Sequence, residues 1–84
     1  MYLAKVYVSL KLTVNDPQGL TISGGLHSLG FYEVKQVRAG KYIEVTLDVE
    51  NLEAARERVS EMCRQLLANP VIEQFRFKVE EVSG

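Results

Sequence analysis

Residues 2–12 alternate between apolar and polar side chains, and this period of two is the feature that most narrows the folds open to the chain. Such alternation is typical of a β-strand with one face buried and the other exposed to water. A half-buried strand needs neighbouring strands and a covering layer, so the pattern predicts a sheet packed against further structure. The apolar residues are Tyr2, Ala4, Val6, Val8, Leu10 and Leu12, and Lys5, Tyr7, Ser9 and Lys11 lie between them.

Three later segments extend the predicted sheet. Residues 42–49 and 74–80 alternate in the same way and predict two further strands. Residues 33–38 alternate poorly, because Val34 and Val37 are three positions apart, and they predict a short strand. Residues 39–41 form a turn, and we expect Gly40 to join the short strand to the strand over 42–49 as a hairpin.

A first helix is predicted after the opening strand. Asp16 is a good N-cap and Pro17 suits the first helical position, where its missing N–H costs nothing. Gly30 is placed to end the helix in a left-handed conformation. Gly24 and Gly25 lie inside the helix, and we expect them where another backbone approaches closely. The apolar stripe of this helix consists of Ile22, Leu26 and Leu29.

A second helix is predicted before the last strand. Asn51 can cap its start, and the pair Asn69-Pro70 ends it, because proline disfavours helical geometry in the residue before it. Apolar residues recur three and four positions apart, which indicates one buried face. These residues are Leu52, Ala55, Val59, Met62 and Leu66.

The predicted order is therefore β-α-β-β-α-β, an α+β fold in a single domain over residues 1–84. Two helices are expected on one face of a mainly antiparallel four-stranded sheet. The opposite face keeps Leu3, Tyr7 and Tyr42, so we expect that face to be used in a homo-oligomer. A chain of 84 residues with a single cysteine has no intrachain disulfide, and a partner chain is another way to stabilise so small a core.

Composition excludes several classes of function. The net charge is −1 and charges of both signs are mixed, so the basic stripe of a nucleic-acid-binding protein is absent. No apolar run reaches the roughly 18 residues of a membrane span, and Met1 leads into the alternating segment rather than into a signal peptide. One cysteine and one histidine do not make a usual zinc pattern. A lone thiol without an export signal indicates the cytoplasm.

No catalytic constellation is visible. His27 is the only histidine, and we expect a solvated or capping side chain, because its serine neighbours Ser23 and Ser28 do not form a triad with it. Cys63 lies beside the apolar stripe of the second helix and is expected to be buried and inert. The carboxylates are scattered over exposed faces, so general acid–base chemistry has no evident site.

Two short segments are candidates for contact with a partner or an anion. The turn over 38–41 places two cations around a glycine, which indicates either a solvated tip or a docking or phosphate-contacting tip. Gln18-Gly19 lies at a helix N-terminus, where backbone N–H groups favour anions. The candidate contact residues are Gln18, Gly19, Arg38, Gly40 and Lys41.

Several segments, in order along nearly the whole chain, resemble the PurS family, the small subunit of phosphoribosylformylglycinamidine synthase. Each is weakly specific alone, whereas together they form a collinear match. Asn15 departs from the apolar residue that many members carry there, which affects only local packing at the helix entry. The matching segments are residues 6–11, 16–19, 26–30, 37–44 and 66–73.

The resemblance implies a non-catalytic assembly subunit of an ATP- and glutamine-dependent ligase in purine biosynthesis. It implies two larger partners, a glutaminase subunit (PurQ) and a synthetase subunit (PurL), which PurS bridges, and a possible role in ammonia transfer between them. It implies dimers or tetramers of the chain itself. The complex then uses ATP, Mg²⁺ and glutamine, with no cofactor or metal bound by this chain.

Two other classes of function stay open on the residues. One is a small ligand-binding regulatory domain, in which Gly24-Gly25 and the tip from Arg38 to Lys41 would touch the ligand. The other is an acylphosphatase-like hydrolase, which needs an anion-cradling loop with an arginine after the first strand. Residues 11–16 contain no arginine, and the hydrolase is disfavoured on that ground.

Overall fold

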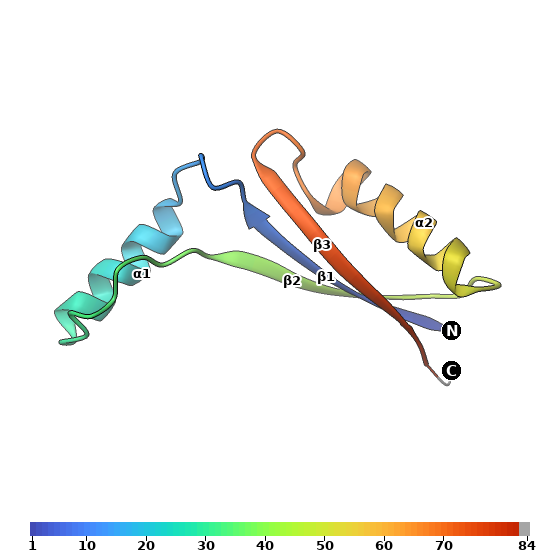
Figure 1. Cartoon of the computed structure of the whole chain (residues 1–84), viewed down its shortest axis with the longest axis horizontal. Helices are drawn as coiled ribbons and strands as arrows, with labels where there is room; N and C mark the ends of the chain where they lie inside the picture. The colour runs from blue at the N-terminus through green and yellow to red at the C-terminus, as the bar shows by residue number, and fades with distance from the viewer. Residues whose placement is uncertain (83–84) are drawn as a thin grey trace.

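The elements of the computed structural model, which describes residues 1–82, follow the predicted order except in one place. The chain begins with β1 (Tyr2–Leu10), α1 (Pro17–Ser28), β2 (Gly40–Leu47) and α2 (Leu52–Met62). It continues through η1, a π-helical turn (Cys63–Leu67), into β3 (Glu73–Glu81). Figure 1 shows α1 at one end of the molecule and α2 over the sheet at the other.

The sheet has three strands in the order β2-β1-β3, and β1 is antiparallel to both neighbours. Val6 lies opposite Ile43 and Phe77, whereas Tyr7 lies opposite Arg76 on β3. Successive side chains of a strand point to opposite faces. We call the face that carries Val6 the inner face and the face that carries Tyr7 the outer face.

The predicted fourth strand over residues 33–38 is wrong, and so is the hairpin through Gly40. These residues are not in a strand; they run beside α1 instead of joining the sheet (Figure 1). Because Val34 and Val37 do not alternate, the segment has no apolar face to lay on a core. The Nε2–H of His27 donates to the Val34 carbonyl at 2.8 Å, and a side chain at Gly19 would collide with the Val37 carbonyl.

The core lies between the inner face and α2, which packs on β1 and β3. β1 contributes Tyr2, Ala4, Val6 and Val8, as the sequence predicts, and the buried residues of α2 meet them. The predicted strand is too long at its end, because Leu10 is only half-buried and Leu12, beyond the strand, is 82% exposed. Asn51 caps α2, with its side-chain oxygen accepting a hydrogen bond from the Ala54 N–H at 2.8 Å. The most buried side chains are Ala4, Val6, Val8, Ala55, Val59 and Cys63.

The end of the second helix departs from the predicted stripe. Leu66 was expected to be buried but is 84% exposed, whereas Cys63 is fully buried and Leu67 is half-buried. The cause is the π-helical turn, in which the Ala68 N–H donates to the Cys63 carbonyl five residues back. The wider turn rotates the following residues, so Leu67 takes the inward position that an α-helix gives to Leu66.

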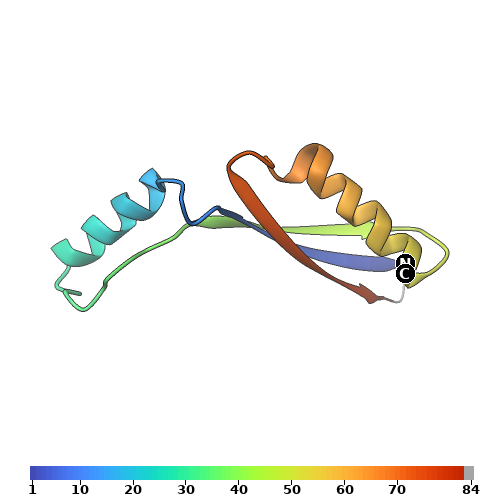
Figure 2. The ribbon, with the colours of Figure 1, turned by 45° about the horizontal axis from the view of Figure 1, so that its top comes forward.

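The position of α1 corrects the prediction of two helices on one face of the sheet. Residues 11–39, which we call the arm, extend beyond the ends of the strands, and α1 lies in the arm (Figures 1 and 2). The molecule is accordingly elongated, with extents of 50 × 29 × 14 Å. Ile22 is 42% and Leu29 76% exposed, so the apolar side of α1 is left largely uncovered in this chain.

Candidate functional site at the root of the arm and the outer face

The predicted contact residues gather where the arm meets the sheet. Gln18, Gly40 and Lys41 line one hollow of about 220 Å³, together with Asp16 and Glu73. Gly19 and Arg38 lie on the other side of Asp16, in a separate hollow of about 180 Å³. The structure therefore brings together residues from two distant segments that the sequence marked separately. Whether they contact a partner stays a prediction.

Asp16 is the central residue of the region where the arm meets the sheet, which we call the root of the arm. Its Oδ1 accepts a hydrogen bond from the Gly19 N–H at 2.9 Å, which is the predicted N-cap of α1. Its Oδ2 accepts a second from the Ala39 N–H at 2.7 Å. These two bonds stabilise the ionised form and hold the pKa of Asp16 below its usual range. The side chain is buried, so the carboxylate itself occupies the anion position at the N-terminus of α1.

Arg38 is committed to its own chain. Its guanidinium donates to the carbonyls of Lys11 at 2.9 Å and Val14 at 3.1 Å, and also reaches that of Leu10. Carbonyls at the end of β1 and in the following loop thereby gain charge-assisted partners. Arg38 and Asp16 together fasten both ends of the arm to each other, a role that sequence spacing does not indicate.

The two glycines of the candidate set are close-packing positions. Gly40 is the first residue of β2, and a Cβ there would lie 2.5 Å from the Val8 carbonyl oxygen. Among residues 1–82 the glycine with positive φ is Gly30, at 98°, which confirms the predicted end of α1. The expectation of close backbone approach at Gly24 and Gly25 is wrong within this chain, because a Cβ there meets nothing within 4 Å.

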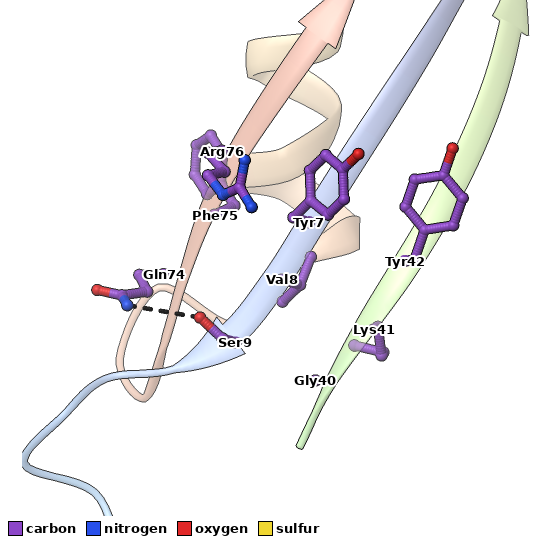
Figure 3. A pocket seen from close by; sticks show the side chains of 9 residues that line it. All are labelled: Tyr7, Val8, Ser9, Gly40, Lys41, Tyr42, Gln74, Phe75 and Arg76. Atoms are coloured by element: carbon purple, nitrogen blue, oxygen red, sulfur yellow. Dashed lines mark hydrogen bonds between the residues drawn. The ribbon is translucent and has the colours of Figure 1, made fainter. Parts of the chain in front are cut away.

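A second group of side chains lies on the outer face beside Lys41 (Figure 3). The rings of Tyr7 and Tyr42 lie with centroids 5.1 Å apart, and the Arg76 guanidinium carbon lies 4.3 Å from the centre of the Tyr7 ring. The Tyr42 hydroxyl donates to the Glu44 carboxylate at 2.7 Å, and this bond raises the pKa of Tyr42 to about 12. We call Tyr7, Tyr42 and Arg76 the outer cluster.

The outer cluster borders a hollow of about 460 Å³ that is also lined by Gln74, Lys41 and Gly40. The alternation along the strands predicts exposed side chains for Tyr7 and Tyr42, but it does not connect them with Arg76. The missing information was the strand order and register, which set Tyr7 between Tyr42 and Arg76. Two tyrosines and an arginine in one hollow are a composition typical of binding surfaces rather than of catalytic sites.

The residues that were candidates for chemistry are placed as expected. His27 is exposed and its ring N–H donates to the Val34 carbonyl beyond the end of α1, whereas Cys63 is buried, and burial raises the pKa of its thiol. In the described part of the chain, no three His, Cys, Asp or Glu side chains lie close enough to hold a metal ion. Neither helix within residues 1–82 has the length and apolar character needed to cross a membrane.

Comparison with known proteins gives one consistent family. Residues 3–81 match the family model described as PurS, phosphoribosylformylglycinamidine (FGAM) synthase. The chain is 51% identical to the phosphoribosylformylglycinamidine synthase subunit PurS of Bacillus subtilis (strain 168), over 98% of this chain and 96% of that protein. It is 46% identical to the PurS subunit of Methanocaldococcus jannaschii, over 98% of this chain and 99% of that protein.

Solved structures agree with the sequence relatives. The crystal structure of Methanocaldococcus jannaschii PurS superposes with a TM-score of 0.89, at 46% identity and covering 99% of this chain and 100% of that one. A chain of PurLQS from Thermotoga maritima superposes with a TM-score of 0.83, at 33% identity and covering 95% of this chain and 99% of that one. The architecture with a single covering helix and an extended arm is therefore shared with solved relatives.

Proposed function

The chain belongs to the PurS family, the small subunits of phosphoribosylformylglycinamidine synthase, and from this premise we propose that it is the non-catalytic assembly subunit of that glutamine-dependent ligase of purine biosynthesis. The observation that carries the proposal is the nearly full-length match to PurS, including the PurS chain of the Thermotoga maritima PurLQS complex. In that role the chain joins a PurL-type synthetase subunit to a PurQ-type glutaminase subunit.

The assembly role has a chemical reason. Ammonia released from glutamine at one subunit is protonated in neutral water, and the protonated form is not a nucleophile. Two active sites that exchange ammonia therefore benefit from a sealed contact, which requires shape and fixed spacing rather than a reactive side chain. The outer cluster and the arm offer surfaces of this kind. ATP, Mg²⁺ and glutamine are then handled by the larger subunits, and any help from this chain with ammonia transfer is part of the proposal.

The assembly unit is expected to be a homo-oligomer built by exchange of the arm. The uncharged helix α1 exposes Ile22 and Leu29 on one side, and such a stripe is stable when it is buried. The inner face keeps Ile43 and Val45 of β2 only half-buried, because α2 packs on β1 and β3. A second copy's α1 beside α2 would complete the predicted layer of two helices, one of them donated by the partner.

The bonds at the root of the arm are the reason for choosing a second copy over α1 folding back on its own sheet. Asp16 links the start of α1 to Ala39, and Arg38 links the return segment to the end of β1. Both ends of the arm are thereby held in the direction that leads away from the sheet. The earlier expectation that the outer face forms the homo-oligomer remains a separate prediction.

Light scattering during gel filtration tests the exchange. Ile22→Asp should convert the oligomer into a folded monomer, because it places a charge in the buried contact. Thr21→Asp adds the same charge at the neighbouring exposed position of α1 and should leave the oligomer intact. An Ile22→Asp chain that keeps the wild-type mass would contradict arm exchange. The assembly role itself would be unaffected by that result.

Reconstitution tests the assembly role. The isolated chain should show no turnover with formylglycinamide ribonucleotide, ATP and glutamine, and adding it to the PurL and PurQ subunits should restore glutamine-dependent synthesis. Ammonium chloride in place of glutamine is the control, because synthesis from supplied ammonia should need the chain far less. The proposal is lost if the two larger subunits assemble and work with glutamine equally well in its absence.

The alternative function is a small ligand-binding regulatory domain, which the hollow beside the outer cluster favours by its size. Calorimetry with purine-pathway metabolites separates the two functions, since absence of binding at millimolar concentration removes the alternative. The single-domain organisation over residues 1–84 and the cytoplasmic location stay part of the proposal and rest on the sequence pattern and on the lone thiol.

A further inference from the structure

The outer cluster is the strongest surface feature that the fold and the proposed assembly role leave unused. We propose that its hollow receives an acidic side chain from one of the two larger subunits of the synthase, with the carboxylate bound by Arg76. The proposal rests on the assembly function, and it specifies which face of the chain is used and which chemistry the partner presents.

The charges on the outer face favour a carboxylate as the occupant. Lys5 is paired with Glu80 at 3.1 Å, and Glu44 accepts the hydroxyl hydrogen of Tyr42. Lys41, which lies at the rim on the same face as Val8, is paired with Glu73 at 3.7 Å, and Lys78 of the outer face does not line the hollow. Within residues 1–82, no carboxylate forms an ion pair with Arg76. The hollow therefore has a cation at its border whose charge the chain itself does not neutralise, and a carboxylate is the group that complements it.

The position of Arg76 beside Tyr7 also favours a carboxylate. Arg76 lies over the Tyr7 ring at 4.3 Å, and Figure 3 shows the guanidinium beside Tyr7. A guanidinium placed over an aromatic ring keeps N–H groups that do not face the ring, and these can bind a carboxylate through two parallel hydrogen bonds. Tyr42 is held by Glu44, so the aromatic wall is ordered before a partner arrives, which lowers the entropy cost of binding.

Two other occupants, a second copy and a free small molecule, fit this face less well, and the test below separates them from the proposed one. A second copy docked about a two-fold axis that passes near Arg76 would set the two Arg76 side chains against each other, which places like charges together. A free small molecule in a hollow on an open sheet face would remain partly in water, whereas ligand sites bury roughly 70–90% of the ligand surface. A protruding side chain of a large subunit avoids both costs, because the flanking surfaces of the two proteins then cover it.

Reconstitution with purified PurL and PurQ subunits provides the test. The measured quantity is the concentration of this chain that gives half-maximal glutamine-dependent synthesis. Arg76→Gln should raise it by about tenfold or more, the effect of losing a central arginine anchor. Lys78→Gln is the matched control, since it removes the same charge two residues along on the same strand and face and should shift it by less than about threefold.

The outcomes separate the possibilities. Equal behaviour of Arg76→Gln and wild type, or an equal shift with Lys78→Gln, would overturn the proposal. So would a change of oligomer mass in Arg76→Gln by light scattering, because the face would then belong to a second copy, or binding of a free carboxylate metabolite to the isolated wild-type chain. If Arg76→Gln fails to fold, Arg76→Lys takes its place. It keeps the charge but loses the planar guanidinium, so it should need a higher concentration than wild type for half-maximal synthesis. Failure of the wild-type chain to restore synthesis overturns the assembly function instead.

Discussion

Asp16 and Ala39 stand at the two ends of the arm, and the Ala39 N–H donates a 2.7 Å hydrogen bond to the Asp16 carboxylate across 23 positions of sequence. The same carboxylate caps α1 through Gly19. One side chain thus determines both where the helix begins and where the returning chain enters β2. The direction of the arm depends on this pair more than on any apolar contact of α1.

Acid should weaken this pair before it weakens the core. The pKa of Asp16 is lowered in the folded chain, whereas it is about 3.9 in an unfolded one. Its contribution to stability is therefore complete above that value and is lost as the pH falls through the lower, folded pKa. Asp16→Asn should be less stable than wild type at neutral pH, and the difference should shrink below about pH 4. Urea unfolding at a series of pH values measures it. If the difference in unfolding free energy between wild type and Asp16→Asn were the same at every pH, the charge of the carboxylate would not contribute to stability.

The inward face of the second helix gives a second prediction. Val59→Asp should lower the free energy of unfolding by about 3 kcal/mol or more, because it buries a charge without a partner. Leu66→Asp, seven residues along the same predicted stripe, should change it by no more than about 0.5 kcal/mol, because Leu66 is exposed. Chemical denaturation of both variants measures the contrast. Equal losses would show that the helix stays α-helical through Leu66.

The local features of this fold were predictable from sequence because short-range physics determines them. The alternation of β1, the Asp16 and Asn51 caps and the left-handed Gly30 each depend on residues within a few positions. The π-helical turn after Met62 was not predictable in this way. This turn determines which of Leu66 and Leu67 faces the core. Because both residues are leucine, their hydrophobicity does not indicate which one is buried.

The long-range features were not predictable. Nothing near α1 in the sequence tells whether its stripe lies on its own sheet or projects from it, because the answer depends on bonds from Asp16 and Arg38 to distant backbone groups. The candidate site shows the same limit. Arg38 and Lys41 were marked by their charge, whereas Arg76 was missed because only strand register brings it to Tyr7. Family resemblance supplied the assembly role that these local patterns do not contain.

The buried thiol gives a third prediction. Burial raises the pKa of Cys63, so little thiolate is present at neutral pH and reagents do not reach it. A thiol reagent should label the native wild-type chain far more slowly than the unfolded one. Leu66→Cys in a Cys63→Ala background puts a thiol on an exposed position of the same turn and should react rapidly. Similar native rates for the two thiols would show that the end of the helix opens frequently.

Close packing at Gly40 gives the last prediction. Gly40 pairs with Ser9 at the start of β2, and a Cβ there would lie 2.5 Å from the Val8 carbonyl oxygen, which is fixed in the central strand. Gly40→Val should therefore lower the free energy of unfolding by about 1–3 kcal/mol through overpacking, without any contribution from positive φ. Gly24→Ala is the control, since its added methyl group meets open space inside α1 and should be neutral or stabilising by up to about 1 kcal/mol. Thermal unfolding of the two variants measures the difference. A Gly40→Val chain as stable as wild type would mean that β2 can shift away from Val8 at its first residue, and the hollow beside the outer cluster would then have a movable wall.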